Sequence, residues 1–237
     1  MNPPTTRDDS PRPGVTPKQL GVGMRFSLHP HCDAYVDVIL GALMDAGDAG
    51  LTEGLVVDTD DVSTYVGALV APAEQRLVGY LAGVISSAYH RSGGGHVVVQ
   101  VLLSRGCPGE VSCDLTVTGL PRVAPIALGL TGVRASAHWS LYPLLDAGSD
   151  AGTHMAHIEA AISDAQRRGT ASEPAHYATR LDGDVGEVLA TAADAWAAVG
   201  AVVPHVVTHL TVSVGSRTQS RSQSLSRSSS RSSSTQA

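Results

Sequence analysis

The stretch Arg25-Phe26-Ser27-Leu28-His29-Pro30 recurs about 113 residues later as His138-Trp139-Ser140-Leu141-Tyr142-Pro143. Both copies read aromatic-Ser-Leu-aromatic-Pro, with His29 counted as the aromatic residue of the first copy. A second pair of related stretches follows in the same order, Asp61-Val62-Ser63-Thr64 and His176-Tyr177-Ala178-Thr179. Two shared landmarks in one order predict a duplicated unit. Two copies are too few for a solenoid, so the pattern indicates a tandem domain.

Each copy has the apolar periodicity of a β-α-β-β-α-β unit. In the first copy we predict strands over 22–28, 55–58, 62–70 and 97–103. Helices are expected over 35–46, with Asp33 as cap, and from Pro72 to 89. In the second copy we predict a strand over 133–142, a helix over 152–168, a hairpin over 171–181, a helix from the cap Asp184 to 202, and a strand over 206–214. This order predicts an α+β fold of tandem ferredoxin-like repeats with antiparallel sheets.

The order of elements also divides the chain. We expect the first repeat over 21–109, a Pro-containing linker over 110–132, and the second repeat over 133–215. Residues 1–20 are predicted to form a disordered arm, and the Arg/Ser-rich residues 216–237 a disordered tail. A ferredoxin-like sheet carries helices on one face only, so we expect the sister repeat or a second subunit to cover the other face.

Composition narrows the possible functions. The formal net charge is −6, and 7 of the 16 basic residues lie outside residues 21–215. Residues 21–215 are therefore more acidic than the chain as a whole. An acidic domain disfavours binding of nucleic acid and tolerates a cationic ligand. The single lysine, Lys18, excludes a catalytic lysine from the repeats. With no apolar run long enough to span a membrane and no secretory leader, we expect a cytoplasmic protein without membrane insertion.

Several chemistries are disfavoured by the motifs. No Gly-x-Ser-x-Gly elbow occurs, and Gly93-Gly94-Gly95 lacks the Gly-Lys-Ser/Thr of a phosphate-binding loop. The three cysteines match no zinc spacing. The pairs His154/His157 and His205/His209 have no carboxylate or cysteine at ligand spacing. We therefore expect no metal, no cofactor and no catalytic residue.

The hydroxyl groups of the repeated stretches are the best candidates for ligand contacts. Ser27 and Ser140 are central in the first strands, whereas Ser63-Thr64 and Thr179 open the third strands. First and third strands are neighbours in this topology, so these hydroxyls could face one another. Hydroxyls donate and accept hydrogen bonds, and that matches the edge of a planar heterocycle. The alternative interpretation is that they are ordinary strand residues.

Two further residues have two interpretations each. Cys107 lies in Arg105-Gly106-Cys107-Pro108-Gly109, which forms either a tight turn or the lip of a pocket. His176, in the second pair of related stretches, is either a structural imidazole or a ligand contact.

The quoted motifs resemble the YkoF-type thiamin/hydroxymethylpyrimidine-binding family. The resemblance runs from Met24-Arg25-Phe26-Ser27-Leu28 through Thr59-Asp60-Asp61-Val62-Ser63-Thr64 and Gly106-Cys107-Pro108-Gly109 to Leu141-Tyr142-Pro143, His176-Tyr177-Ala178 and Leu181-Asp182-Gly183-Asp184, over about 22–215. It implies ACT-like repeats, a homodimer, and a site for the aminopyrimidine of thiamin in each repeat. The implied pocket residues are Ser27, Leu28, Ser63 and Thr64, with Cys107 at the rim, in the first repeat, and Ser140, Leu141, His176 and Thr179 in the second. Asp61 stands where the family commonly has His, and His29 replaces the Tyr found at Tyr142, so the two sites are expected to differ.

Three functions stay open. The first is non-catalytic binding of thiamin or its hydroxymethylpyrimidine precursor in uptake or salvage, with a thiamin-precursor transport system as partner. The second is a thiamin-pathway enzyme that uses Cys107 or His176, which the missing lysine, phosphate loop and triad disfavour. The third is an ACT-like regulatory module that senses another small metabolite.

Overall fold

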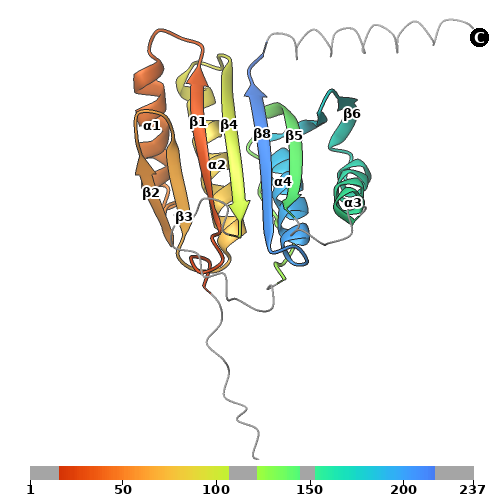
Figure 1. Cartoon of the computed structure of the whole chain (residues 1–237). Coiled ribbons are helices and arrows are strands. Elements are labelled where there is room, and N and C mark those ends of the chain that lie inside the picture. The colour runs from red at the N-terminus through yellow and green to blue at the C-terminus, as the bar shows by residue number, and fades with distance from the viewer. Residues whose placement is uncertain (1–15, 107–121, 145–152, 217–237) are drawn as a thin grey trace, which may run out of the picture.

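The computed structural model of the chain describes residues 16–106, 122–144 and 153–216 (Figure 1). The first repeat consists of β1 (Gly23–Pro30), α1 (Tyr35–Asp48), β2 (Leu55–Thr59), β3 (Thr64–Ala68), α2 (Ala73–Arg91) and β4 (Val97–Arg105). The second consists of β5 (Arg134–Leu144), α3 (Thr153–Arg167), β6 (Ala171–Ala175), β7 (Ala178–Asp184), α4 (Val185–Gly200) and β8 (His205–Val214). Both have the predicted β-α-β-β-α-β order, so the α+β tandem ferredoxin-like fold is confirmed.

The two repeats share one antiparallel sheet. Its eight strands lie in the order β2-β3-β1-β4-β8-β5-β7-β6. The repeats meet where β4 pairs with β8, from Val97 opposite Val214 to Arg105 opposite Val206. The sister repeat therefore extends the sheet at its edge and does not cover the open face, so of the two expected covers the sister repeat is wrong and the second subunit stays a prediction. Figure 1 shows α2 and α4 behind the central strands, with the other face of those strands toward the viewer.

Alternation along the strands separates a core face from a helix-free face. On β1, Met24, Phe26 and Leu28 are buried, whereas Arg25 and His29 are exposed. The same alternation in β4 and β8 buries a row of valines and leucines beneath α2 and α4. We call the opposite surface, to which Arg25, Ser27 and His29 belong, the helix-free face.

Hydrogen bonds place the repeats in residue-by-residue correspondence. Phe26 pairs with Thr64 in the first repeat, and Trp139 pairs with Thr179 in the second. After α1 the amide of Leu51 donates to Ala46, and after α3 the amide of Thr170 donates to Ala165, at 3.0 and 3.2 Å. Counting back from Ala46 and Ala165 makes Ile39 equivalent to Ile158 and Leu43 equivalent to Ile162.

Only one of the two predicted aspartate caps forms. Asp184 begins α4 with a capping box, in which its carboxylate accepts from the Gly186 amide and Glu187 accepts from the Asp184 amide. The prediction for Asp33 is wrong, because Ala34 precedes α1 and no side chain caps it.

The chain outside the predicted repeats is partly packed against them. Residues 16–20 form a hydrogen-bonded turn that buries Leu20, although the sequence assigns them to the arm. The described part of the predicted linker also joins the fold, since the Ile126 amide donates to Asp194 and the Thr131 amide to Asp184. Residues 1–15 of the predicted arm and 217–237 of the predicted tail lie outside the described ranges.

Candidate functional site

A pocket of about 310 Å³ opens between α3 and the sheet of the second repeat. Its walls come from the repeated motif on β5, from one stripe of α3, and from the turn between β6 and β7. The lining residues are Trp139, Ser140, Leu141, Tyr142, Ile158, Ile162, Ala175, Tyr177, Ala178 and Thr179. The site is therefore mostly apolar, and it is built around the second copy of the motif that the sequence repeats.

Hydrogen bonds fix the wall contributed by β5. The Trp139 indole donates to the Thr208 hydroxyl at 2.7 Å, and Thr208 donates in turn to the Ser140 carbonyl at 2.9 Å. Thr208 is completely buried, and the bond from the indole is shielded from water. The indole is thereby held in one orientation at the pocket.

A tight turn forms the rim of the pocket. Ala175 pairs with Ala178, so His176 and Tyr177 alone connect β6 to β7. Tyr177 has a φ of 62°, a left-handed conformation that is uncommon for a bulky residue, and its side chain is fully exposed. The Ser140 hydroxyl donates to the Tyr177 carbonyl at 3.1 Å. This serine therefore ties the first strand to the turn.

The first repeat uses its serine in the same way. The Ser27 hydroxyl donates to the Val62 carbonyl at 3.1 Å, so Val62 is the counterpart of Tyr177. Here the turn is held by Asp60, whose carboxylate accepts from the amides of Val62 and Ser63, both at 2.8 Å. Those amide bonds from Ser63 and Val62, with a further bond from Arg25, lower the pKa of Asp60. Arg25 also donates to the Ser63 hydroxyl at 2.7 Å.

The predicted face-to-face pairing of serine and threonine hydroxyls is wrong. Thr64 pairs with Phe26 rather than with Ser27, and neighbouring residues of a strand point to opposite faces. Ser27 therefore lies on the helix-free face and Thr64 on the core face. Thr64 is only 5% exposed, and its hydroxyl lies 3.0 Å from that of Thr59. Thr179, the counterpart of Thr64, is half-buried and lines the pocket.

Comparison with known proteins bears on this site. The family described as "YKOF-related Family" matches residues 134–219. A protein of Bacillus subtilis (strain 168) named "Putative HMP/thiamine-binding protein YkoF" is 30% identical over 171 residues, which cover 71% of this chain and 78% of that protein. The chain belongs to the YkoF-related family. The matched residues 134–219 contain the whole described lining of the pocket, and thiamin-related binding is the activity that the family suggests.

The second-repeat pocket contains three of the four residues predicted for that repeat. Ser140, Leu141 and Thr179 line it, whereas His176 is exposed in the turn and is not among the lining residues. Of the first-repeat candidates, Ser27, Ser63 and Thr64 all make hydrogen bonds within the protein. Leu28 is buried on the core face. Cys107 lies outside the described residues.

The sequence analysis missed the rim of the pocket. Tyr177 stood in a quoted motif, but nothing in the motif indicates its left-handed conformation or its exposure. The apolar periodicity that predicted the helix over 152–168 does not distinguish a helix face packed in the core from one that forms a pocket wall. Within the described ranges, no group of three or more His, Cys, Asp or Glu residues could hold a metal ion.

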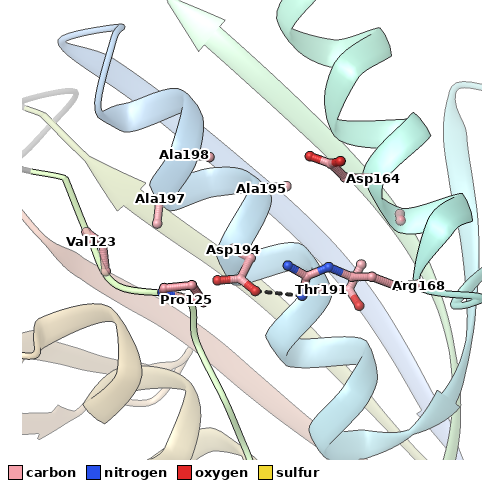
Figure 2. Close-up of a pocket in the computed structure, with 10 residues that line it drawn as sticks. Val123, Pro125, Asp164, Arg168, Thr191, Asp194, Ala195, Ala197 and Ala198 are labelled. Carbon is pink, nitrogen blue, oxygen red and sulfur yellow. Dashed lines mark ion pairs between the residues drawn. The ribbon is translucent and has the colours of Figure 1, made fainter.

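A second cavity of about 190 Å³ lies on the other side of α3, toward α4 and residues 123–125. Figure 2 shows Arg168 reaching from the end of α3 to Asp194 on α4, and these side chains form an ion pair at 2.6 Å. Asp194 also accepts a bond of 2.6 Å from the Ile126 amide. The charged groups of this cavity therefore join α3, α4 and the linker, which is a structural role.

Proposed function

We propose that this protein binds thiamin or its hydroxymethylpyrimidine precursor without catalysis, at one site per repeat, and serves uptake or salvage of thiamin precursors in the cytoplasm. The observation that carries the proposal is the second-repeat pocket, which is formed by the repeated motif in a chain of the YkoF-related family. Its volume lies at the lower end of the range for small-molecule sites, as suits a single substituted ring. A transport system for thiamin precursors is the proposed partner.

The lining suits a flat heterocycle with one polar edge. Trp139, Leu141, Ile158 and Ile162 supply apolar surface for the faces of the ring. Thr179 supplies a hydroxyl that donates and accepts, and strand backbone near the pocket adds further donors and acceptors. An aminopyrimidine has ring nitrogens that accept and an amino group that donates. The pocket can therefore hold it by shape and by a few hydrogen bonds.

The first repeat is proposed to hold the second site at the equivalent place. Phe26, Leu28, Ile39 and Leu43 correspond to the four apolar walls of the pocket, and Thr64 corresponds to Thr179. Because the Thr64 hydroxyl lies against that of Thr59, a ligand there has to replace this internal contact. We therefore expect weaker binding at the first site than at the second.

Titration calorimetry with thiamin and with hydroxymethylpyrimidine tests the proposal. We expect Thr179→Val to weaken binding at the second site by about 1–3 kcal/mol, because a polar group of the bound ligand loses its partner. Thr211→Val, on β8 and away from the pocket lining, is the matched control and should leave both affinities unchanged. If the wild-type protein gives no heat with either compound at millimolar concentration, the proposal is wrong.

The non-catalytic part of the proposal has its own test. Thiamin recovered chemically unaltered after prolonged incubation with the protein is the expected result. If the protein instead converts thiamin, and Cys107→Ser or His176→Ala abolishes the conversion, the protein is an enzyme.

A homodimer is the proposed assembly. The helix-free face exposes large apolar side chains on its central strands, with Leu102 on β4 at 42% exposure and Tyr142 on β5 at 49%. A second copy packed on this face would bury them, as the two sheets of a sandwich cover each other.

No helix in the described ranges is long and apolar enough to cross a membrane.

A further inference from the structure

The walls of the two sites correspond, but their rims do not. The aromatic, leucine and aliphatic helix residues of the second pocket each have an apolar counterpart in the first repeat. At the rim, Tyr177 replaces Val62. Because the difference lies at the rim, we expect both sites to hold the same ring in the pocket. They should differ in how well they bind the part of the ligand that extends past the mouth.

The rim of the first repeat is ionic. Asp60 and Arg25 form an ion pair at 3.2 Å, and both side chains are about half exposed. Arg25 also donates a hydrogen bond to the Ser63 hydroxyl. Asp60, Arg25 and Ser63 are therefore linked by an ion pair and a hydrogen bond, and these charged contacts hold the turn in place.

The rim of the second repeat is aromatic. Tyr177, in the turn that borders the pocket, is an exposed aromatic residue of the lining. Among the described residues that line it there is no Asp or Glu. Any attraction that these lining side chains exert on a positive charge therefore comes from aromatic faces, which bind cations through their quadrupole.

Tyr177 is placed for this contact by an unfavourable backbone conformation. A bulky residue avoids a left-handed φ unless the surrounding structure enforces it. Here the short β6–β7 connection and the bond from Ser140 to the Tyr177 carbonyl enforce it. The consequence is a phenol ring that is fully exposed to solvent, on a turn that lines the pocket.

We propose that Tyr177 makes the second site selective for thiamin over hydroxymethylpyrimidine, because its ring lies against the cationic thiazolium when the pyrimidine occupies the pocket. The inference rests on the proposed function. The neutral precursor has no second ring, so it gains nothing from Tyr177. The first site, with Val62 at the equivalent position, lacks this preference.

Trp139 provides a signal specific to the second site. The chain has two tryptophans, and the other, Trp196, is buried with its indole bonded to the Val206 carbonyl at 3.1 Å. In a Trp196→Phe background, fluorescence titration of the full chain therefore reports binding at the second pocket alone. Thiamin and hydroxymethylpyrimidine are the two probes.

In this background we expect Tyr177→Leu to weaken thiamin binding about 2- to 5-fold, the range of an exposed cation–π contact, and to leave hydroxymethylpyrimidine binding unchanged. Tyr177→Phe, which keeps the ring, should retain thiamin affinity. Val62→Tyr, read by calorimetry, should raise the thiamin preference of the first site. Equal losses for both probes, or no loss for thiamin, would refute the role of Tyr177 while leaving the proposed function intact. Absence of binding by the parent protein would remove both.

Discussion

Asp182 is held by a network of hydrogen bonds on the helix-free face of the second repeat. Burial acts to raise the pKa of this carboxyl, but bonds from Arg180, Ser136 and Ser172 outweigh that effect and lower the pKa from 3.8 to about 2. A carboxyl whose pKa is lowered by folding stabilises the protein above its unfolded pKa and ceases to do so as the pH falls through the folded pKa. The stabilising window therefore closes between about pH 4 and pH 2.

We expect Asp182→Asn to reduce the free energy of unfolding at pH 6 by about 2 kcal/mol at most, as the size of the shift implies. Urea unfolding at pH 6, 4.5 and 3.5 measures this, and the difference from wild type should shrink at the lowest pH. Asp58→Asn, on the same face near the opposite edge of the sheet, is the control and should stay within about 0.5 kcal/mol. A difference that does not depend on pH would show that the charge of Asp182 is not the cause.

For single residues, the sequence predicted which ones lie together at the pocket, but not the face of the sheet to which each side chain points. Ser140, Leu141 and Thr179 were named from the repeated motif, and all three line the pocket. The predicted meeting of serine and threonine hydroxyls depended on strand register, where a shift of one residue exchanges the faces. Thr64 is opposite Phe26, so the hydroxyls diverge. The conformation of Tyr177 depends on the length of the turn, which periodicity alone does not give.

The helix α4 begins with a cap that also anchors the linker. Asp184 accepts from the Gly186 amide at 2.8 Å and from the amides of Thr131 and Gly132 at 2.9 and 2.8 Å. Asp184→Ala should cost about 1–2 kcal/mol of stability, at the upper end for a cap because the linker contacts are lost too. The measurement is the midpoint of chemical unfolding.

Asp33→Ala is the matched control, because Asp33 precedes α1 without capping it. It should change stability by less than about 0.5 kcal/mol. Equal costs for the two substitutions would show that Asp184 acts through charge near a helix start and not through its bonds. The pair also explains the mixed outcome of the cap predictions. Both aspartates satisfy the sequence rule, but in the first repeat Ala34 occupies the cap position.

Secondary structure was predictable here because each element has a strong period. The long apolar runs of β4 and β8 and the stripes of α1 and α3 need no tertiary information. The pairing of β4 with β8 was not foreseen, since either strand could end its own sheet. Their fully buried core-face residues, such as Val99 and Leu210, indicate strands covered by helices but not which strand lies alongside.

The joined sheet has a consequence for the whole molecule. Edge-to-edge pairing places the helices of both repeats on one side and leaves one broad helix-free face. Apolar side chains on this face, including Leu102 and Tyr142, are exposed in the single chain. This arrangement is the physical reason for proposing a dimer that packs face to face, since the sister repeat is not available to cover the sheet.

Leu102→Glu tests the dimer at the scale of the whole molecule. Light scattering after size-exclusion chromatography should give twice the chain mass of 24.4 kDa for the wild type and the mass of one chain for the variant, because removing a carboxylate from water into the interface between two sheets is costly. The matched control is Leu40→Glu on α1, a leucine 53% exposed on the helix side, which should remain dimeric. Circular dichroism would verify that both variants are folded. A wild type of one chain mass at all concentrations, or equal dissociation of both variants, would contradict packing through the helix-free face.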